Sequence, residues 1–233
     1  MTHFELTDET RTLADGKVLN RIRATQDLPH YGVTAGTLGG WVEHAHNLTG
    51  RAWVSGQAAV TGQARVTGQA WVIDQARVTG QAWVTGQANV TDWARVAGQA
   101  QVTGQAVVTG QARVYGQARV TGQAVVTGQA WVTGLAWVTG DALVTAPAEV
   151  VTVGPIGSEG CTATLHRTTD GHALHVGCWT GTLDALPAEV ARRRPTWDAP
   201  QAMQEAWIAQ YEALILLGRT TITTWDADGS EDS

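Results

Sequence analysis

The chain has few of the residues that would place it in several common classes of protein. Its 233 residues include two cysteines, Cys161 and Cys178, and a single lysine, Lys17. Two cysteines are too few for a disulfide framework, which fits a reducing compartment. No apolar run reaches the length of about 18 residues that a membrane-spanning helix needs, and the first residues lack the pattern of a secretory signal. We therefore expect a cytoplasmic protein without a membrane partner.

Positive charge is also scarce. Lysine and arginine together number 15 against 21 aspartate and glutamate residues, so the formal net charge is −6. Proteins that bind duplex nucleic acid usually carry a net basic field that attracts the phosphates. The composition therefore argues against duplex nucleic acid as a partner.

What the chain does have is one short unit that recurs through nearly half of its length. An aliphatic residue stands at every sixth position from Val42 to Val150, and an alanine stands two positions before it from Ala52 to Ala148. The unit reads A-x-V-T-G-Q. Its alternation predicts a short strand with alanine and valine inside, and Gly-Gln predicts a turn because glycine adopts positive φ without steric cost. Such a short fixed period predicts a solenoid of stacked units.

The hexapeptide resembles that of the left-handed parallel β-helix family, in which three hexapeptides form one coil of eighteen residues. The resemblance implies a mainly β fold with about six coils over residues 41–151. On either side we expect an N-terminal β-hairpin cap over 1–40 and a small C-terminal α+β domain, a hairpin plus helices, over 152–218. The remaining residues, 219–233, are expected to form an acidic mobile tail.

Turn and cap signals give the C-terminal domain more detail. Asp170-Gly171 predicts a hairpin in which His166 faces His175 and Cys178 faces Ala163, so a disulfide would need a register slip. Asp184 is the predicted N-cap of a short helix that ends in the arginines before Pro195. A longer helix is expected to run from Pro200 to Gly218.

Motifs outside the repeat make the resemblance specific to a smaller group of proteins. The segments FELTDET and GTLGGWVE precede the repeat, and GPIGS and TGTLDAL follow it. Together they resemble a group of phage and prophage proteins labelled hexapeptide-repeat, polymer-forming or YdcK-like. The resemblance covers nearly the whole chain and implies a phage context without a particular activity.

Residues eighteen apart stack in one column of the predicted coil, which sorts the outward positions onto three sides. One side is mainly apolar, and monomers rarely expose an apolar strip of that length. We therefore predict an interface in a homo-oligomer, with a trimer favoured because the resembled fold commonly forms trimers; cover by the C-terminal helices is the alternative. The predicted interface residues are Trp53, Trp71, Val107, Val125 and Leu143.

The next side carries a column of arginines, Arg77, Arg95 and Arg113, which ends at Trp131. Like charges on neighbouring strands repel unless something negative lies on them, and both arginine and tryptophan stack on aromatic bases. The column therefore predicts a site for an anionic, nucleotide-like small molecule, with solvated, splayed guanidiniums as the alternative. The glycine-rich bend with Gly154, Gly157 and Ser158 is a second candidate, because its amides could cradle an anion.

No metal and no cofactor is expected. Asp74 and Asp92 replace the turn glycine in adjacent coils, where aspartate tolerates the left-handed turn conformation. A metal held by the two carboxylates is the alternative. His166 and His175 lack a visible third ligand, so we expect a half-exposed cross-strand pair rather than a metal site.

The expected function is that of a non-enzymatic binding or scaffold protein that self-associates and that binds an anionic small molecule or a host protein. One alternative is a homologue of the acyl-coenzyme A transferases that share the resembled fold. Those enzymes use a catalytic histidine and projecting loops, whereas residues 54–150 contain no histidine and no insertion. His46 is expected to replace the small interior residue in the first coil. Another alternative, from the stacked threonines, is an ice-binding or structural fibre module.

Overall fold

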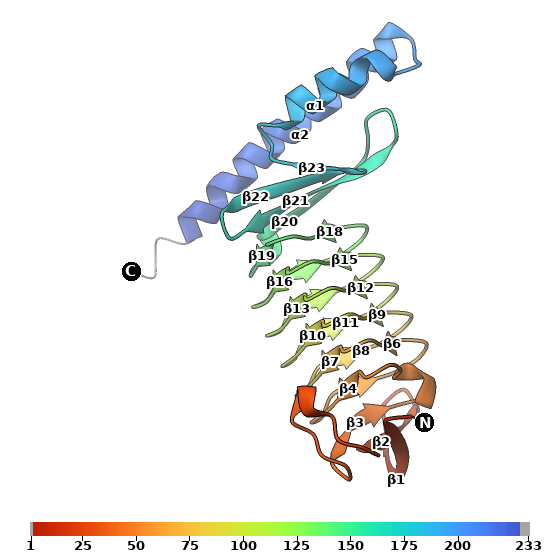
Figure 1. The fold of residues 1–233 in the computed structure, drawn as a ribbon. Helices are drawn as coiled ribbons and strands as arrows, with labels where there is room; N and C mark the ends of the chain where they lie inside the picture. Colours follow the sequence, from red (N-terminus) through yellow and green to blue (C-terminus); the bar gives the residue numbers. More distant parts are fainter. Residues whose placement is uncertain (1, 229–233) are drawn as a thin grey trace.

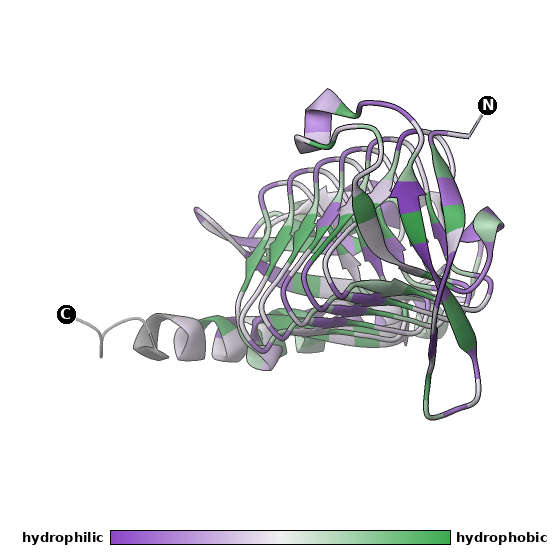
Figure 2. Cartoon of the chain, turned by 90° about the horizontal axis from the view of Figure 1, so that it is seen from below, coloured by the Kyte–Doolittle hydropathy of each residue, from purple (hydrophilic) through white to green (hydrophobic). Residues whose placement is uncertain are grey.

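The computed structural model describes residues 2–228. Figure 1 shows three parts in succession: antiparallel strands at the N-terminal end, a stack of coils, and a sheet with two helices at the C-terminal end. Figure 2 views the coils from the N-terminal end, where α2 extends to one side beyond their outline. No helix within the described residues is both long and apolar enough to cross a membrane.

The repeat forms a β-solenoid of about six turns with three parallel walls. The arginine side contains β3 (Leu38–Val42), β5 (Ala59–Val60), β8 (Arg77–Val78), β11 (Arg95–Val96), β14 (Arg113–Val114) and β17 (Trp131–Val132). The valine side contains β4 (Trp53–Val54), β7 (Trp71–Val72), β10 (Asn89–Val90), β13 (Val107–Val108), β16 (Val125–Val126) and β19 (Leu143–Val144). The third side contains β6 (Arg65–Val66), β9 (Trp83–Val84), β12 (Gln101–Val102), β15 (Arg119–Val120) and β18 (Trp137–Val138).

The register confirms the predicted eighteen-residue coil. Arg95 pairs with Arg77 on one side and Arg113 on the other, and every parallel pair in the three walls has the same spacing. The valines at every sixth position from Val54 to Val144, and the alanines two positions before them from Ala52 to Ala142, are at most 1% exposed. The repeat therefore buries one face of each short strand, as its alternation predicts. At the turns the glycines have positive φ, and Asp74 and Asp92 adopt the same conformation at φ 61° and 57°.

Both ends of the coil depart from the repeat in the same way. The 3-10 turns η2 (Ala45–Asn47) and η3 (Pro147–Glu149) replace the turn before Leu48 and Val150. Each turn buries its last residue, which is polar, whereas His46 and Ala148 are exposed. The predicted inward positions of His46 and Ala148 are therefore wrong. At both coil ends a polar residue takes the buried position, and its side chain binds free backbone groups.

Asn47 and Glu149 supply those hydrogen bonds. Asn47 Nδ2 donates to the carbonyl oxygens of Gly62 and Ala64 at 3.0 and 2.8 Å, and its Oδ1 accepts from the His44 amide at 2.8 Å. Glu149 Oε2 accepts from the amides of Thr145 and Ala146. The two residues thus cap the first and last coils from within.

The N-terminal hairpin continues the arginine side. β1 (Phe4–Thr12) pairs antiparallel with β2 (Val18–Ala24), and β2 pairs with β3, which is the first strand of that wall. The turn contains Gly16 at φ 84°, and the antiparallel pairing confirms the predicted hairpin. Phe4 and Ile22 are buried in the solenoid core, so the hairpin closes this end of the rod.

The C-terminal domain is an antiparallel sheet of β20 (Val150–Ile156), β21 (Cys161–Thr168), β22 (Gly171–Val176) and β23 (Trp179–Gly181). It sits on the last coil, where the Trp137 amide donates to Thr164 Oγ1 at 3.1 Å. Its other face packs against α1 (Leu186–Arg193) and α2 (Gln201–Asp228) through a second apolar core that includes Leu165, Leu174 and Leu214.

Several sequence-based details of this domain are wrong. The register of β21 and β22 places His166 opposite Ala173 and Thr164 opposite His175, a shift of two residues. The N-cap of α1 is Ala185, because Asp184 turns outward to pair with Arg219. α2 does not end at Gly218 but continues to Asp228, so the first part of the expected mobile tail is helical. Residues 229–233 lie outside the described residues.

Candidate functional site

The arginine side presents its three arginines in an unbroken ladder. Arg77, Arg95 and Arg113 occupy equivalent positions of β8, β11 and β14 and pair directly across the strands. Arg77 and Arg95 are exposed and Arg113 is half-buried. None of the three forms an ion pair with any residue that the structure describes. The ladder is thus a strip of like charge without an internal counterion.

Trp131 continues the ladder and contacts its last arginine. The guanidinium carbon of Arg113 lies 5.2 Å from the centroid of the Trp131 ring, within the range of a cation–π interaction. Trp131 remains 50% exposed. The structure therefore brings together all four residues that the sequence assigned to this side, with one planar aromatic surface open to solvent.

A further cation lies beside the ladder, and the sequence analysis missed it. Arg11 comes from the end of β1, and its guanidinium carbon lies 4.8 Å from the centroid of the Trp41 ring. Its Nη1 donates to Gln57 Oε1 at 3.2 Å. Partial burial lowers the pKa of Arg11, and the positive charge of Arg77 lowers it further. No sequence signal points to this neighbour, because residues 1–40 lie outside the repeat and their position follows from tertiary packing.

The hairpin tip and the arginine side enclose a groove of about 530 Å³. Leu13 and Lys17 line it from the hairpin, and Thr61, Arg77 and Thr79 line it from the coils. Lys17 is paired with Asp15 at 2.5 Å, so Arg77 is the cation of the groove that has no acidic partner among the described residues. The groove therefore offers a concave place next to an otherwise flat charged strip.

The glycine-rich bend packs against α2. The Gly157 amide donates to Gln210 Oε1 at 2.7 Å, and the Tyr211 hydroxyl packs where a Cβ on Gly157 would stand. Ser158 is half-buried beside it. α2 thus occupies the part of the bend around Gly157, and the anion-binding role of Gly154, Gly157 and Ser158 stays a prediction.

The valine side is partly covered by the chain itself. Trp53 is 0% exposed and belongs to the same core as Leu28 and Tyr31, which come from the segment before β3. The Trp71 ring meets Tyr31 edge-to-face at 5.5 Å. Trp53 is therefore unavailable to a second subunit, and the predicted interface no longer includes it. Val107, Val125 and Leu143 are half-buried.

Asp92, one of the two aspartates that replace a turn glycine, binds groups within the protein. Asp92 Oδ2 accepts hydrogen bonds from Thr109 Oγ1 at 2.5 Å and from the Gly110 amide at 3.0 Å, which hold the pKa of Asp92 below its usual range. Residues 2–228 contain no group of three or more histidine, cysteine or acidic side chains placed to hold a metal ion.

A comparison of the chain with protein-family models finds no matching family, and a comparison with curated proteins finds no matching relative. The geometry of the arginine side therefore carries the functional argument.

Proposed function

We propose that this protein is a non-enzymatic binding solenoid that holds an anionic, nucleotide-like small molecule on its arginine side. The observation that carries the proposal is the ladder of Arg77, Arg95 and Arg113, which has no acidic partner in the described residues. The left-handed sense of the coil, the phage-type context and self-association belong to the same proposal.

The ladder favours an anion with more than one charge. Neighbouring strands lie about 4.8 Å apart, so the guanidiniums of Arg77 and Arg113 start from backbones separated by about 10 Å. Phosphate groups accept paired hydrogen bonds from arginine, and an anion that touches two or three members relieves the repulsion between them. A ligand with a single carboxylate gains less from such an array.

Trp131 favours a ligand that also has a planar ring. Its half-exposed indole stands one strand beyond Arg113, so a base could stack there while its phosphates lie along the arginines. Arg77 and the groove under the hairpin tip mark the opposite end of the ladder. A nucleotide satisfies both the charge and the aromatic surface of this side.

A thermal-shift screen of nucleotides against salt-matched controls tests the proposal. We expect nucleotides with two or three phosphates to raise the melting temperature of the wild type and to have little effect on Arg95→Ala. Arg119→Ala is the matched control, because Arg119 lies on the third side and is stacked on Trp137 at 5.9 Å, much as Arg113 is on Trp131. No shift beyond the salt control, or equal losses in both variants, would contradict the proposal.

Self-association rests on the valine side. Val107, Val125 and Leu143 form a column of half-buried aliphatic residues in β13, β16 and β19, and the main contacts of α2 are with α1, β20 and η3. Aliphatic columns of this kind are stabilised when a second apolar surface removes them from water. We propose a homo-oligomer, with a trimer favoured, that meets along the valine side.

A further inference from the structure

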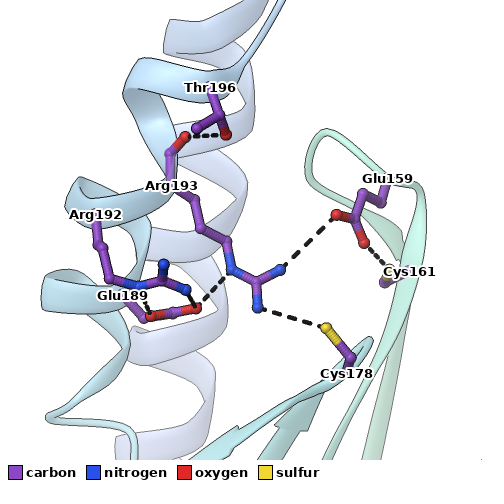
Figure 3. Close-up of polar contacts among 7 residues, drawn as sticks. All are labelled: Glu159, Cys161, Cys178, Glu189, Arg192, Arg193 and Thr196. Carbon is purple, nitrogen blue, oxygen red and sulfur yellow. Dashed lines mark hydrogen bonds and ion pairs between the residues drawn. The ribbon is translucent and has the colours of Figure 1, made fainter.

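A second cluster of reactive side chains lies in the C-terminal domain, and it joins two thiols to one ion pair (Figure 3). Arg193 Nη1 lies 3.8 Å from Glu159 Oε1, and Arg193 Nη2 lies 3.6 Å from Cys178 Sγ. On the other side of the ion pair, Cys161 Sγ lies 3.5 Å from Glu159 Oε2. The cluster thereby connects the bend after β20, the turn between β22 and β23, and the last turn of α1.

The observed strand register brings the ends of β21 and β22 that carry the two cysteines close together. Ala163 and Val176 form the last pair of the two strands, and Cys161 and Cys178 lie two residues beyond them. A Cβ built on Gly177 would lie 2.8 Å from Cys161 Sγ. This contact puts that sulfur within about 8 Å of the Cα atom of Cys178, since consecutive Cα atoms are about 3.8 Å apart.

This separation is close to what a disulfide requires. Disulfides bridge Cα atoms about 4.4–6.8 Å apart. Cys178 lies in the two-residue turn that ends β22, where a small backbone adjustment is less costly than inside a ladder. Both cysteines are free in the structure; Cys178 is exposed and Cys161 is half-buried.

We propose that Cys161 and Cys178 are a redox-sensitive pair that forms an intramolecular disulfide by exchange with a small-molecule disulfide such as glutathione disulfide. The Cys178 thiolate, next to the Arg193 guanidinium, attacks one sulfur of the small disulfide. It forms a mixed disulfide and releases one thiolate of the small molecule. Cys161 then gives its proton to the Glu159 carboxylate, attacks Cys178 Sγ and releases the second thiolate. Two protein thiols are oxidised to one disulfide, and one small disulfide is reduced to two thiols.

The environments of the two thiols set this order of attack. Burial and the Glu159 carboxylate raise the pKa of Cys161, so it reacts second and needs Glu159 as proton acceptor. Cys178 is the accessible sulfur and faces a cation. When the bond forms, Cys178 Sγ leaves Arg193, which also binds Glu189 through its Nε at 2.5 Å. Oxidation therefore changes how the end of α1 is held on the sheet.

The reduced full-length protein, incubated with glutathione disulfide and analysed by intact and peptide mass spectrometry without reductant, tests the proposal. We expect a product that has lost two hydrogens and contains a peptide linked through Cys161 and Cys178. In the Cys161→Ser variant, the reaction should stop at a single glutathionyl adduct on Cys178. A wild type that keeps the adduct, or that does not react at all, would overturn the proposal.

Two variants test the roles of the ion pair. Arg193→Ala should slow the first exchange about threefold to tenfold, because the thiolate loses its cation. Arg192→Ala is the matched control, since Arg192 binds the same Glu189 carboxylate without contacting Cys178. Glu159→Gln should leave the first exchange unchanged and slow the loss of the adduct. Should Arg193→Ala disturb α1 in circular dichroism, Arg193→Lys replaces it and should react more like the wild type. Equal first-exchange rates in the Arg193 and Arg192 variants would refute the role of Arg193.

Discussion

His166 and His175 stack on each other between the C-terminal sheet and the last coil, with ring centroids 5.4 Å apart and planes inclined by 21°. Trp137 of the last coil extends the stack, 5.4 Å from the ring of His175. The histidines are 0% and 3% exposed, and neither Nε2 atom has a hydrogen-bond partner. The expected half-exposed pair is therefore wrong, because the solenoid itself covers this face of the sheet.

This stack predicts a loss of stability in mild acid. Burial lowers the pKa of His166 to about 4 from its usual value of 6.5, and burial lowers the pKa of His175 as well. Between these two pH values the unfolded chain binds more protons, so the stabilisation is present above pH 6.5 and is lost as the pH falls toward 4. The lowered pKa of His166 accounts for about 3 kcal/mol of the free energy of unfolding that is lost over this pH range. Denaturant unfolding of the C-terminal domain measured from pH 7.5 to 4 checks this expectation.

A substitution separates the effect of His166 from general acid denaturation. His166→Phe keeps an aromatic ring in the stack but cannot bind a proton, so its stability should depend less on pH over this window. His30→Phe, at an exposed position, is the control and should keep the wild-type profile. An equally steep pH dependence in His166→Phe would show that His166 is not the group responsible.

The environment of Glu149 predicts a second loss of stability at lower pH. We also expect the stability to be sensitive to mutation of Glu149. Burial alone would raise the pKa of Glu149, but hydrogen bonds from Thr145, Arg167 and Ala146 hold it below its usual value. Its stabilisation is therefore present above its usual pKa and is lost as the pH falls through the lowered one. Glu149→Ala leaves the Arg167 guanidinium and two amides without their acceptor, which should cost about 3 kcal/mol.

Chemical denaturation of Glu149→Ala measures that cost. Glu212→Ala, at an exposed position of α2, should change the stability by less than about 0.5 kcal/mol. If the two variants were equally stable, the hydrogen bonds of the Glu149 side chain at the last coil would not be needed for stability.

The middle of the rod should not tolerate a buried charge. Val96→Asp places a carboxylate at a position that is 0% exposed and surrounded by valine and alanine, at a cost of several kcal/mol. The β-signal in circular dichroism should melt at a much lower temperature than in the wild type. Gln99→Asp, exposed in the same coil, should melt close to the wild type. A near-normal melting temperature for Val96→Asp would contradict the inward position of Val96.

The valine side should determine the oligomeric state. Val107→Arg combined with Val125→Arg introduces two stacked charges into the proposed interface, so the mass from multi-angle light scattering should fall to that of a monomer. Circular dichroism should stay unchanged because both side chains point outward. Ala97→Arg, outside this column, is the control. A wild type that is already monomeric would remove the basis for an interface on this side.

The sequence was sufficient for the features that depend on local periodicity. Residues six apart take the same inward position on successive walls, and residues eighteen apart share one column, so the walls and the column of Arg77, Arg95 and Arg113 follow from counting alone. Inside the solenoid, the period fixes which residue of the neighbouring coil pairs with a given residue.

Outside the repeat, only the tertiary structure determined which residues contact one another. The position of Arg11 on the arginine side, the cover of Trp53 by Tyr31, and the burial of Asn47 depend on how non-repeating segments fold back onto the coils. The hairpin register that brings Cys161 near the turn with Cys178 depends on how β21 and β22 meet the last coil and the helices, whereas the turn residues alone indicated a register shifted by two. Such contacts join residues far apart in the chain, and their stability comes from shared burial that no local pattern records.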